Sequence, residues 1–397
     1  MKITRIETVA HPSGLLLCRI HTAEGLIGCG ETHYIPTAVA AVIHDWMAPR
    51  LLGADALAIE GHWRFLYERA ANFGARGAEL RALSAIDLAL WDIKGRACGQ
   101  PVWQLLGGRA QDGVRIYNST GYGRGQTPEP GGTWPGYGRM GVPEPLNDYW
   151  NALHEPAAYA RELLAEGIEG AKLWPFDFAA HKPNGSLFVS GADLETGMQP
   201  FRAMRAAAGN RLELILDGHG FFQLPMALRI AAAMREVNPL ALEDVIRPDC
   251  VDTIRDFRER CGLPLAVSEM LTTVEDYRLV LQRQAADYVM IDPTWVGGIT
   301  ATARITDLAQ AWNIPVMMHD CTGPLTLLAG IHVGVARANV AWQETVRMLL
   351  RLVYPELVTH LPAVKAGRIA APEGPGLGAA WHDTLFKKTD TLRVSTR

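Results

Sequence analysis

The chain has 397 residues, a net charge of −4, and 48% hydrophobic and 20% charged residues. This composition is typical of a soluble globular enzyme, and the length favours two domains over one small core. No apolar run is long enough to span a bilayer, and the scattered basic residues form no patch for nucleic acid.

The opening segment MKITRIETV lacks an apolar signal core. The six cysteines lie far apart and form no CxxC pair, a pattern typical of reduced thiols. We therefore expect a cytoplasmic protein that binds neither membrane nor nucleic acid.

Residues 1–112 are predicted to form an α+β domain. The segments KITRIETVA and GLLLCRIHT alternate in polarity and precede GLIGCGE, as in an antiparallel meander. From about residue 36 the pattern becomes helical. The run AELRALSAIDLALWDIKGRACG has apolar residues at helical spacing and ends at Gly99, with Pro101 just beyond.

Residues 113–350 are predicted to form a (β/α)-barrel. Short, mostly apolar runs, taken as eight strands, alternate along most of this region with amphipathic helical stretches, which fits the usual size of such a barrel. The runs are VRIYNS, GAKLW, LELILD, PLALED, LPLAVSE, YVMID, IPVMMHD and NVAWQE. A doubly wound open sheet would give a similar alternation, but polar residues at the ends of so many strands favour the barrel. Residues 351–397 are predicted to return to the first domain.

A long segment interrupts this pattern after the first barrel strand. Residues 122–146 are rich in Gly and Pro, and a loop of this length in a compact domain is usually functional or disordered. Because it follows a barrel strand, we expect it to act as a lid over the barrel mouth. Its GxGxxG sequence, residues 136–141, follows no strand and precedes no helix, which excludes a dinucleotide site.

Three acids stand 26 residues apart, each at the end of an apolar run: Asp217, Glu243 and Glu269. This spacing is about what one strand, one helix and two short loops occupy. Neighbouring parallel strands would bring the three carboxylates to one mouth of the barrel. Converging oxygen ligands are what Mg²⁺ prefers, so we predict a magnesium site there.

Other strand ends carry Lys172, His219, Asp292, His319 and Glu344. Asp292 is predicted to bind one nitrogen of His319, leaving the other as a general base. His219 lies two residues after Asp217, so an extended strand would turn both side chains toward one cavity. Lys172 is suited to holding a substrate carboxylate or oxyanion.

A single polar residue at a strand end is more often a cap or loop hydrogen bonder than a functional group. The set as a whole favours function, because burying several uncompensated carboxylates without a metal would be costly. Asp244 is expected to point to the opposite face and His332 to serve in packing. Trp134, in the long segment, and Trp174 and Trp295 are placed where they would line a pocket.

The ordered combination resembles the enolase superfamily, in its mandelate racemase-like subgroup. The similarity covers nearly the whole chain and includes SAIDLALWDIKGRACGQPVWQLLGG, LDGHG, LEDV, VSEM, MIDPTWVGGIT and MMHDC. It implies a modified (β/α)7β barrel with an α+β capping domain, and commonly a homo-oligomer. It also implies that Mg²⁺ holds a substrate carboxylate while a base removes the adjacent α-proton to give an enediolate.

The second barrel strand of this subgroup usually ends in Lys-x-Lys, whose second lysine is a base. Here the sequence is Lys172-Leu173-Trp174, and tryptophan accepts no proton. The DxH pattern of Asp217 and His219 resembles acid-sugar dehydratases of the galactonate type. The similarity thus implies a hydro-lyase acting on a sugar acid, with His319 as base and His219 as the acid for the leaving hydroxyl. Lys172, Glu344, Trp174 and Trp295 would contact the substrate.

Two alternatives stay open at this stage. The first is a racemase, epimerase or cycloisomerase on the same scaffold, against which Trp174 argues. The second is a catalytically silent metal-binding or regulatory protein, which would not need both a ligand set and a His–Asp pair.

Overall fold

The computed structural model describes residues 1–121, 146–387 and 390–396. The predicted lid and its GxGxxG sequence therefore lie, apart from residue 146, outside the described residues. No helix in the described part of the chain is both long and apolar enough to cross a bilayer.

A four-stranded antiparallel sheet forms the N-terminal part, as the alternating segments predict. Its order is β14 (Leu392–Thr396), β1 (Ile3–Ala10), β2 (Leu15–Thr22) and β3 (Ile27–His33). Helix α4 (Ala78–Cys98) packs closely against β3. Gly30 permits this approach, because a Cβ atom there would overlap the carbonyl oxygen of Ala85.

Eight parallel strands in the described residues close into a barrel, which confirms the predicted fold and excludes the open sheet. Consecutive strands are hydrogen-bonded neighbours, and the last pairs with the first. The strands are β4 (Val114–Ser119), β5 (Gly170–Leu173), β6 (Glu213–Asp217), β7 (Ala241–Glu243), β8 (Leu265–Val267), β9 (Tyr288–Ile291), β10 (Val316–Met318) and β11 (Val340–Thr345).

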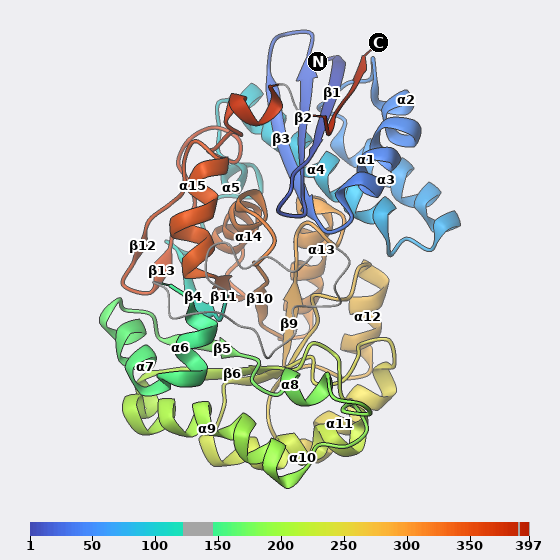
Figure 1. Ribbon diagram of the computed structural model, residues 1–397. Helices are drawn as coiled ribbons and strands as arrows, with labels where there is room; N and C mark the ends of the chain where they lie inside the picture. The colour runs from blue at the N-terminus through green and yellow to red at the C-terminus, as the bar shows by residue number, and fades with distance from the viewer. Residues whose placement is uncertain (122–145, 388–389, 397) are drawn as a thin grey trace.

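Helices between the strands form the outer layer (Figure 1). They include α6 (Asp148–His154), α7 (Pro156–Ala165), α9 (Gly191–Ala208), α10 (Leu224–Met234), α11 (Val251–Cys261), α12 (Val274–Gln282), α13 (Gly298–Ala311) and α14 (Pro324–Ala336). A small cluster of buried side chains from the strands packs together as a separate core: Tyr117, Ile215, Ala241, Ala266, Met290, Met317 and Trp342. The barrel is thus a packed core, which leaves its mouth as the place where strand-end side chains can form a site.

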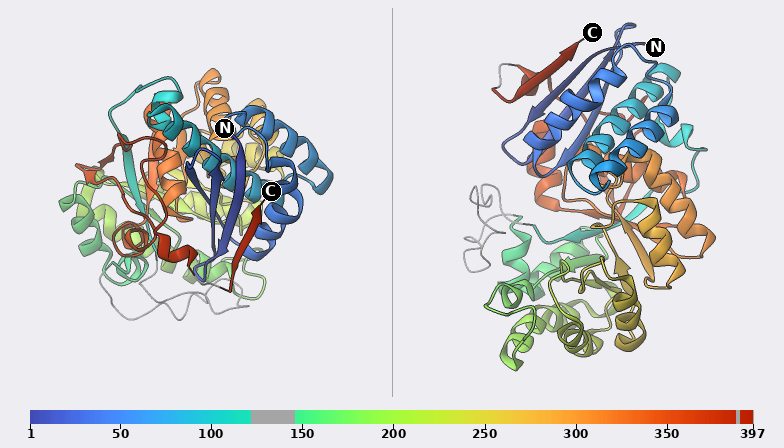
Figure 2. Two further views of the ribbon diagram at one scale, coloured as in Figure 1. Left: turned by 90° about the horizontal axis from the view of Figure 1, so that it is seen from above. Right: turned by 90° about the vertical axis from the view of Figure 1, so that its right-hand side faces the viewer.

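The N-terminal sheet and its helices cover the mouth of the barrel at β9 and β10 (Figures 1 and 2). Thr32 Oγ1 donates a hydrogen bond to the carbonyl of Thr294 at 3.0 Å. Glu31 accepts hydrogen bonds from both the amide and the hydroxyl of Thr326, at 2.5 and 2.9 Å. These contacts place the cap directly over the C-terminal ends of the two strands.

The C-terminal segment runs back over both parts. Strand β13 (Arg368–Ile369) pairs with β4, and the indole N–H of Trp381 donates to the carbonyl of Cys18 in β2 at 3.2 Å. Strand β14 then pairs with β1, so the two chain ends lie close together (Figure 2). The domain boundaries at residues 112 and 350 stay predictions.

Candidate active site

The three predicted metal-binding acids end neighbouring strands at the capped mouth. Asp217 and Glu243 are the last residues of β6 and β7 and stand opposite one another in register, while Glu269 follows β8. All three are buried. Burial and the charge of Asp217 raise the pKa of Glu243 well above its ordinary value. The parallel strands thus place these carboxylates where their charges repel one another.

Lys172, in β5, supplies a positive charge to this group. Its Nζ lies 2.6 Å from Glu243 Oε1, 3.2 Å from Asp217 Oδ2 and 2.8 Å from Glu344 Oε1. Although burial opposes the charged form, Glu243 and Glu344 raise the pKa of Lys172 well above its ordinary value. The lysine is therefore an ammonium ion held among three carboxylates.

The same acids can be tested as a metal-binding set. In the arrangement of the described residues, no three His, Cys, Asp or Glu side chains form a ready metal cluster. Glu243 Oε2 and Glu269 Oε2 are nevertheless buried and have no hydrogen-bond partner. Buried carboxylate oxygens without donors are costly, and they are the oxygen ligands that Mg²⁺ prefers. The donor set thus fits a magnesium ion.

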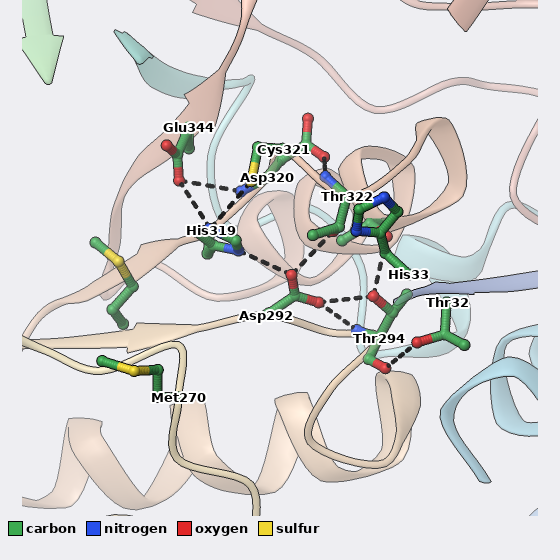
Figure 3. A network of polar contacts seen from close by, with 12 residues as sticks. Thr32, His33, Met270, Asp292, Thr294, His319, Asp320, Cys321, Thr322 and Glu344 are labelled. Carbon is green, nitrogen blue, oxygen red and sulfur yellow. Dashed lines mark hydrogen bonds and ion pairs between the residues drawn. The ribbon is translucent and has the colours of Figure 1, made fainter. Parts of the chain in front are cut away.

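His319 and Asp292 follow β10 and β9 and form the predicted pair (Figure 3). His319 Nδ1 lies 2.8 Å from Asp292 Oδ2. Asp292 is itself held by the amide of Thr294 at 2.8 Å and by the hydroxyl of Thr322 at 2.9 Å. With Nδ1–H donating to the carboxylate, Nε2 is the nitrogen left to accept a proton.

Two groups lie near His319 Nε2. The Sγ atom of Cys321 is 3.5 Å away, and Glu344 Oε2 is 3.8 Å away. Burial opposes protonation, but Cys321, Glu344 and Asp292 together raise the pKa of His319 well above its ordinary value. Glu344 also accepts a hydrogen bond from the Tyr117 hydroxyl at 3.2 Å and contacts Lys172. It thus links the lysine to the histidine.

His219 reaches the site by a route different from the one predicted. Strand β6 ends at Asp217, and His219 has a φ of 46°, so the alternation of an extended strand does not apply. Its amide N–H donates to Asp217 Oδ1 at 2.9 Å, and its Nε2 lies 3.4 Å from Asp217 Oδ2. A tight turn, rather than strand geometry, brings the two side chains together.

Asp177 is a partner of His219 that the sequence analysis missed. It begins the short helix α8 (Asp177–Ala180) after β5, is fully buried, and lies 2.6 Å from His219 Nδ1. Burial opposes the charge, yet Asp217 and Asp177 raise the pKa of His219 to about 10. The only sequence signal was an acid five residues after Lys172.

Asp244 corrects a second expectation. It was predicted to turn away from the acids, but its φ of 39° redirects the chain after Glu243. The Asp244 carboxylate accepts a hydrogen bond from the Ser268 hydroxyl. Burial and the adjacent Glu269 raise its pKa well above its ordinary value. Asp244 thus lies beside the candidate metal ligands. The expectation for His332 agrees with its full burial in α14.

Comparison with known proteins identifies the family. Residues 155–385 match the family described as enolase C-terminal domain-like, and residues 3–107 match the mandelate racemase/muconate lactonizing enzyme N-terminal domain. The chain belongs to the enolase superfamily.

Individual members of the superfamily resemble the chain along more than nine-tenths of its length. A D-galactonate dehydratase family member of Streptomyces bingchenggensis is 30% identical, over 92% of this chain and 87% of the relative. The arabinonate dehydratase of Saccharolobus solfataricus is 26% identical, over 95% and 91%. An enolase of the mandelate racemase subgroup from Agrobacterium tumefaciens has a similar structure, with a TM-score of 0.87, 35% identity, and coverage of 100% and 99%.

Against the pattern of this superfamily subgroup, Trp174 holds the position of the second lysine of Lys-x-Lys. The centre of its ring lies 4.0 Å from that of Tyr149 and 5.6 Å from that of His219, which it contacts edge-on. Its indole N–H donates to the carbonyl of Thr120 at 3.2 Å. Trp295 lies across the site, 5.4 Å from His319. Both predicted aromatic residues therefore contact a histidine of the site.

Proposed function

We propose that the chain is a Mg²⁺-dependent acid-sugar dehydratase. It would remove the proton α to the carboxylate and eliminate the 3-hydroxyl as water, giving a 2-keto-3-deoxy acid after tautomerisation. The observation that carries this proposal is the second histidine–carboxylate pair, His219 with Asp177. Because β6 and β10 stand four positions apart in the ring of eight, this pair faces His319 and Asp292 across the mouth.

The residues divide the proton transfers between two sides. His319 Nε2 would accept the α-proton, and the electrons of the C–H bond would move into the enediolate. Asp292 holds the ring and stabilises the imidazolium that forms. As the C–O bond at C3 breaks, His219 would give its proton to the departing oxygen. Carboxylate partners raise the pKa of both His219 and His319, so the proposed acid and base differ in position rather than in pKa.

The carboxylate end of the substrate is assigned to the acid cluster. Asp217, Glu243 and Glu269 would hold Mg²⁺, which when bound supplies positive charge to the substrate carboxylate. Lys172 would stabilise the negative charge that develops on the enediolate oxygens, and Glu344 orients Lys172 through their contact at 2.8 Å. Trp174 and Trp295 would exclude water and line the substrate space.

A racemase, epimerase or cycloisomerase is the second candidate. Such a racemase needs a proton donor and acceptor on both faces of the α-carbon, and Trp174 removes the lysine that provides one in the related subgroup. A silent metal-binding protein would not exchange an α-hydrogen on any acid. Exchange of the α-hydrogen with solvent deuterium therefore separates an enzyme from a silent protein, and release of water separates a dehydratase from a racemase.

The test screens sugar acids for 2-keto-3-deoxy products and follows two variants on the best substrate. His319→Asn should lose both dehydration and α-exchange. His219→Asn should lose dehydration but keep measurable exchange, because the enediolate still forms and is reprotonated. Each loss should be about 10²–10⁴-fold. The exposed His360→Asn serves as the control. Interconversion of α-epimers without water release by the wild type would instead establish a racemase.

A further inference from the structure

Arg81 places a cation at the boundary between cap and barrel. It lies in the first turn of α4, and its Nη1 donates to the carbonyl of His33 at 2.8 Å. Its guanidinium carbon lies 4.3 Å from the ring centre of Trp295 and 5.5 Å from that of Tyr34. The charge is therefore held between the cap loop after β3 and the barrel residue Trp295.

The Arg81 guanidinium forms no ion pair with any of the described residues. Among residues 1–121, 146–387 and 390–396, no carboxylate lies within ion-pairing distance of it. Two buried arginines differ from it in this respect: Arg347 is paired with Asp148 at 2.6 Å, and Arg19 with Asp383 at 2.8 Å. A partly buried charge without a carboxylate at ion-pairing distance is costly, although Asp292 acts on it from farther away. Within the described residues, one of its five N–H donors has a hydrogen-bond acceptor.

The position of Arg81 relative to the reacting centre follows from Trp295. One face of that indole lies against Arg81, and its ring centre is 5.4 Å from that of His319. Trp295 Nε1 is also buried without a hydrogen-bond partner. In Figure 3, Glu344 and the cap residue His33 lie on opposite sides of His319. A molecule with its carboxylate at the acid cluster and its α-carbon at His319 would thus extend toward Arg81.

We infer that the substrate carries a second anionic group at the end remote from its reacting carboxylate, and that Arg81 binds this group through the free edge of its guanidinium. This inference rests on the proposed function and narrows it. The substrate class would be the doubly charged sugar acids, either aldarates or 6-phosphorylated aldonates. The arabinonate dehydratase described above is named for an acid whose far end is uncharged, so this chain would differ from it.

The test compares matched substrates that differ only at the far end: galactarate, 6-phosphogalactonate and galactonate, and the corresponding gluco and manno sets. The wild type should prefer a doubly charged acid by about 10–100-fold in kcat/KM, as expected for hydrogen bonds to a charged group. Arg81→Gln should lower kcat/KM on the doubly charged acids more than on the aldonate and so remove that preference. Arg81→Lys should restore part of it. Arg76→Gln is the matched control, because Arg76 lies on the same cap but is exposed and paired with Asp276.

A second measurement separates substrate binding from the reaction. Calorimetry measures the binding of the same three acids to the inactive His319→Asn variant in the presence of Mg²⁺. If the variant binds a doubly charged acid more tightly than the aldonate, and this difference depends on Arg81, the inference is supported. Failure of the wild type to dehydrate any of the acids would count only against the proposed function. Tighter binding of galactarate would identify the second anionic group as a carboxylate, and tighter binding of 6-phosphogalactonate would identify it as a phosphate. The inference is overturned if the kcat/KM of the wild type on the aldonates equals or exceeds that on the doubly charged acids. It is also overturned if Arg81→Gln lowers kcat/KM equally on all three acids.

Discussion

At the scale of single residues, the two histidines share one feature and differ in another. Each has a buried carboxylate at Nδ1, 2.8 Å away for His319 and 2.6 Å for His219. Nε2 of His319 faces a thiol and the more distant Glu344, whereas Nε2 of His219 lies 3.4 Å from Asp217. The carboxylate partners should therefore matter for different steps.

Exchanging each partner for its amide tests this division. Asp292→Asn should lower both α-hydrogen exchange and dehydration by about 10²–10⁴-fold, because the base loses its orienting acceptor. Asp177→Asn should lower dehydration to a larger extent than exchange, because it acts on the acid. Both rates can be followed by NMR in deuterated buffer. If Asp177→Asn loses exchange as severely as Asp292→Asn, the two pairs do not divide the proton transfers.

Lys172 is expected to carry a large share of the stability of the site. Lys172→Met would leave Asp217, Glu243 and Glu344 buried without their cation, a change that costs about 3–5 kcal/mol of unfolding free energy. Added Mg²⁺ should recover part of the loss by replacing the positive charge. Denaturant unfolding in chelator and in Mg²⁺ measures both effects.

Lys182→Met is the control for that measurement. Lys182 is exposed and pairs with Asp193, so its removal should cost about 1 kcal/mol or less. A Lys172 variant that is no less stable than the Lys182 variant would contradict the assigned role.

The residues of the site could be predicted only as far as regular structure extends. Acids at the ends of apolar runs were found because each run is a parallel strand whose end opens at the same mouth. His219 and Asp244 have φ values of 46° and 39°, so alternation along a strand does not give their directions. Asp177 lies in a loop helix, and its contact with His219 spans 42 residues. Such turns and distant contacts leave no periodic signal.

At the scale of elements, α14 offers a test of burial and charge. All its residues are buried, including His332, whose Nδ1 accepts the amide N–H of Trp103 at 3.3 Å and whose Nε2–H donates to the carbonyl of Leu377 at 3.2 Å. Protonating Nδ1 would place its new N–H against the amide N–H of Trp103, so that the hydrogen bond between them would be lost. Burial accordingly lowers the pKa of His332 to about 4.

A lowered folded-state pKa fixes the sign of the pH effect. The stability linked to neutral His332 is fully present above the unfolded-state pKa of about 6.5 and is lost as the pH falls toward 4, by up to about 1.4 kcal/mol per pH unit. His332→Gln should make the dependence of unfolding free energy on pH between 6.5 and 4 less steep, with His33 and His44, whose pKa values are also lowered to about 4, accounting for part of what is left. The exposed His360→Gln should leave it unchanged. Equal slopes in the wild type and His332→Gln would contradict this account.

The order of elements was more predictable than their contacts. Eight apolar runs alternating with helical stretches are enough to give eight barrel strands, because both periodicities are local. The seating of the cap depends on pairs such as Thr32 with Thr294, which are 262 residues apart and polar. No local pattern indicates such a pair, so the sequence could predict a cap but not the strands it covers.

At the scale of the whole molecule, the site is a junction of separate units. The reacting groups come from strand ends around the barrel, while His33, Tyr34 and Arg81 come from the cap. In the proposals above, the anion-binding Arg81 and the proton-transfer groups therefore come from different parts of the chain. The acid cluster and the two histidine pairs can therefore be assigned without knowing which sugar acid is the substrate.

A metal ion at the acid cluster would join three successive β/α units, because Asp217 and Glu243 end β6 and β7 and Glu269 follows β8. Binding to the folded state alone should raise the free energy of unfolding by about 2.7 kcal/mol at a Mg²⁺ concentration 100 times Kd. Chelator should therefore abolish dehydration and lower the unfolding midpoint, and Mg²⁺ should restore both. Glu269→Gln should lose the Mg²⁺-dependent stabilisation, since Glu269 Oε2 is a buried oxygen without a donor. The exposed Glu373→Gln should keep it. An unfolding midpoint and a rate that are both indifferent to chelator would contradict the magnesium site, and stabilisation that survives in Glu269→Gln would place the ion elsewhere.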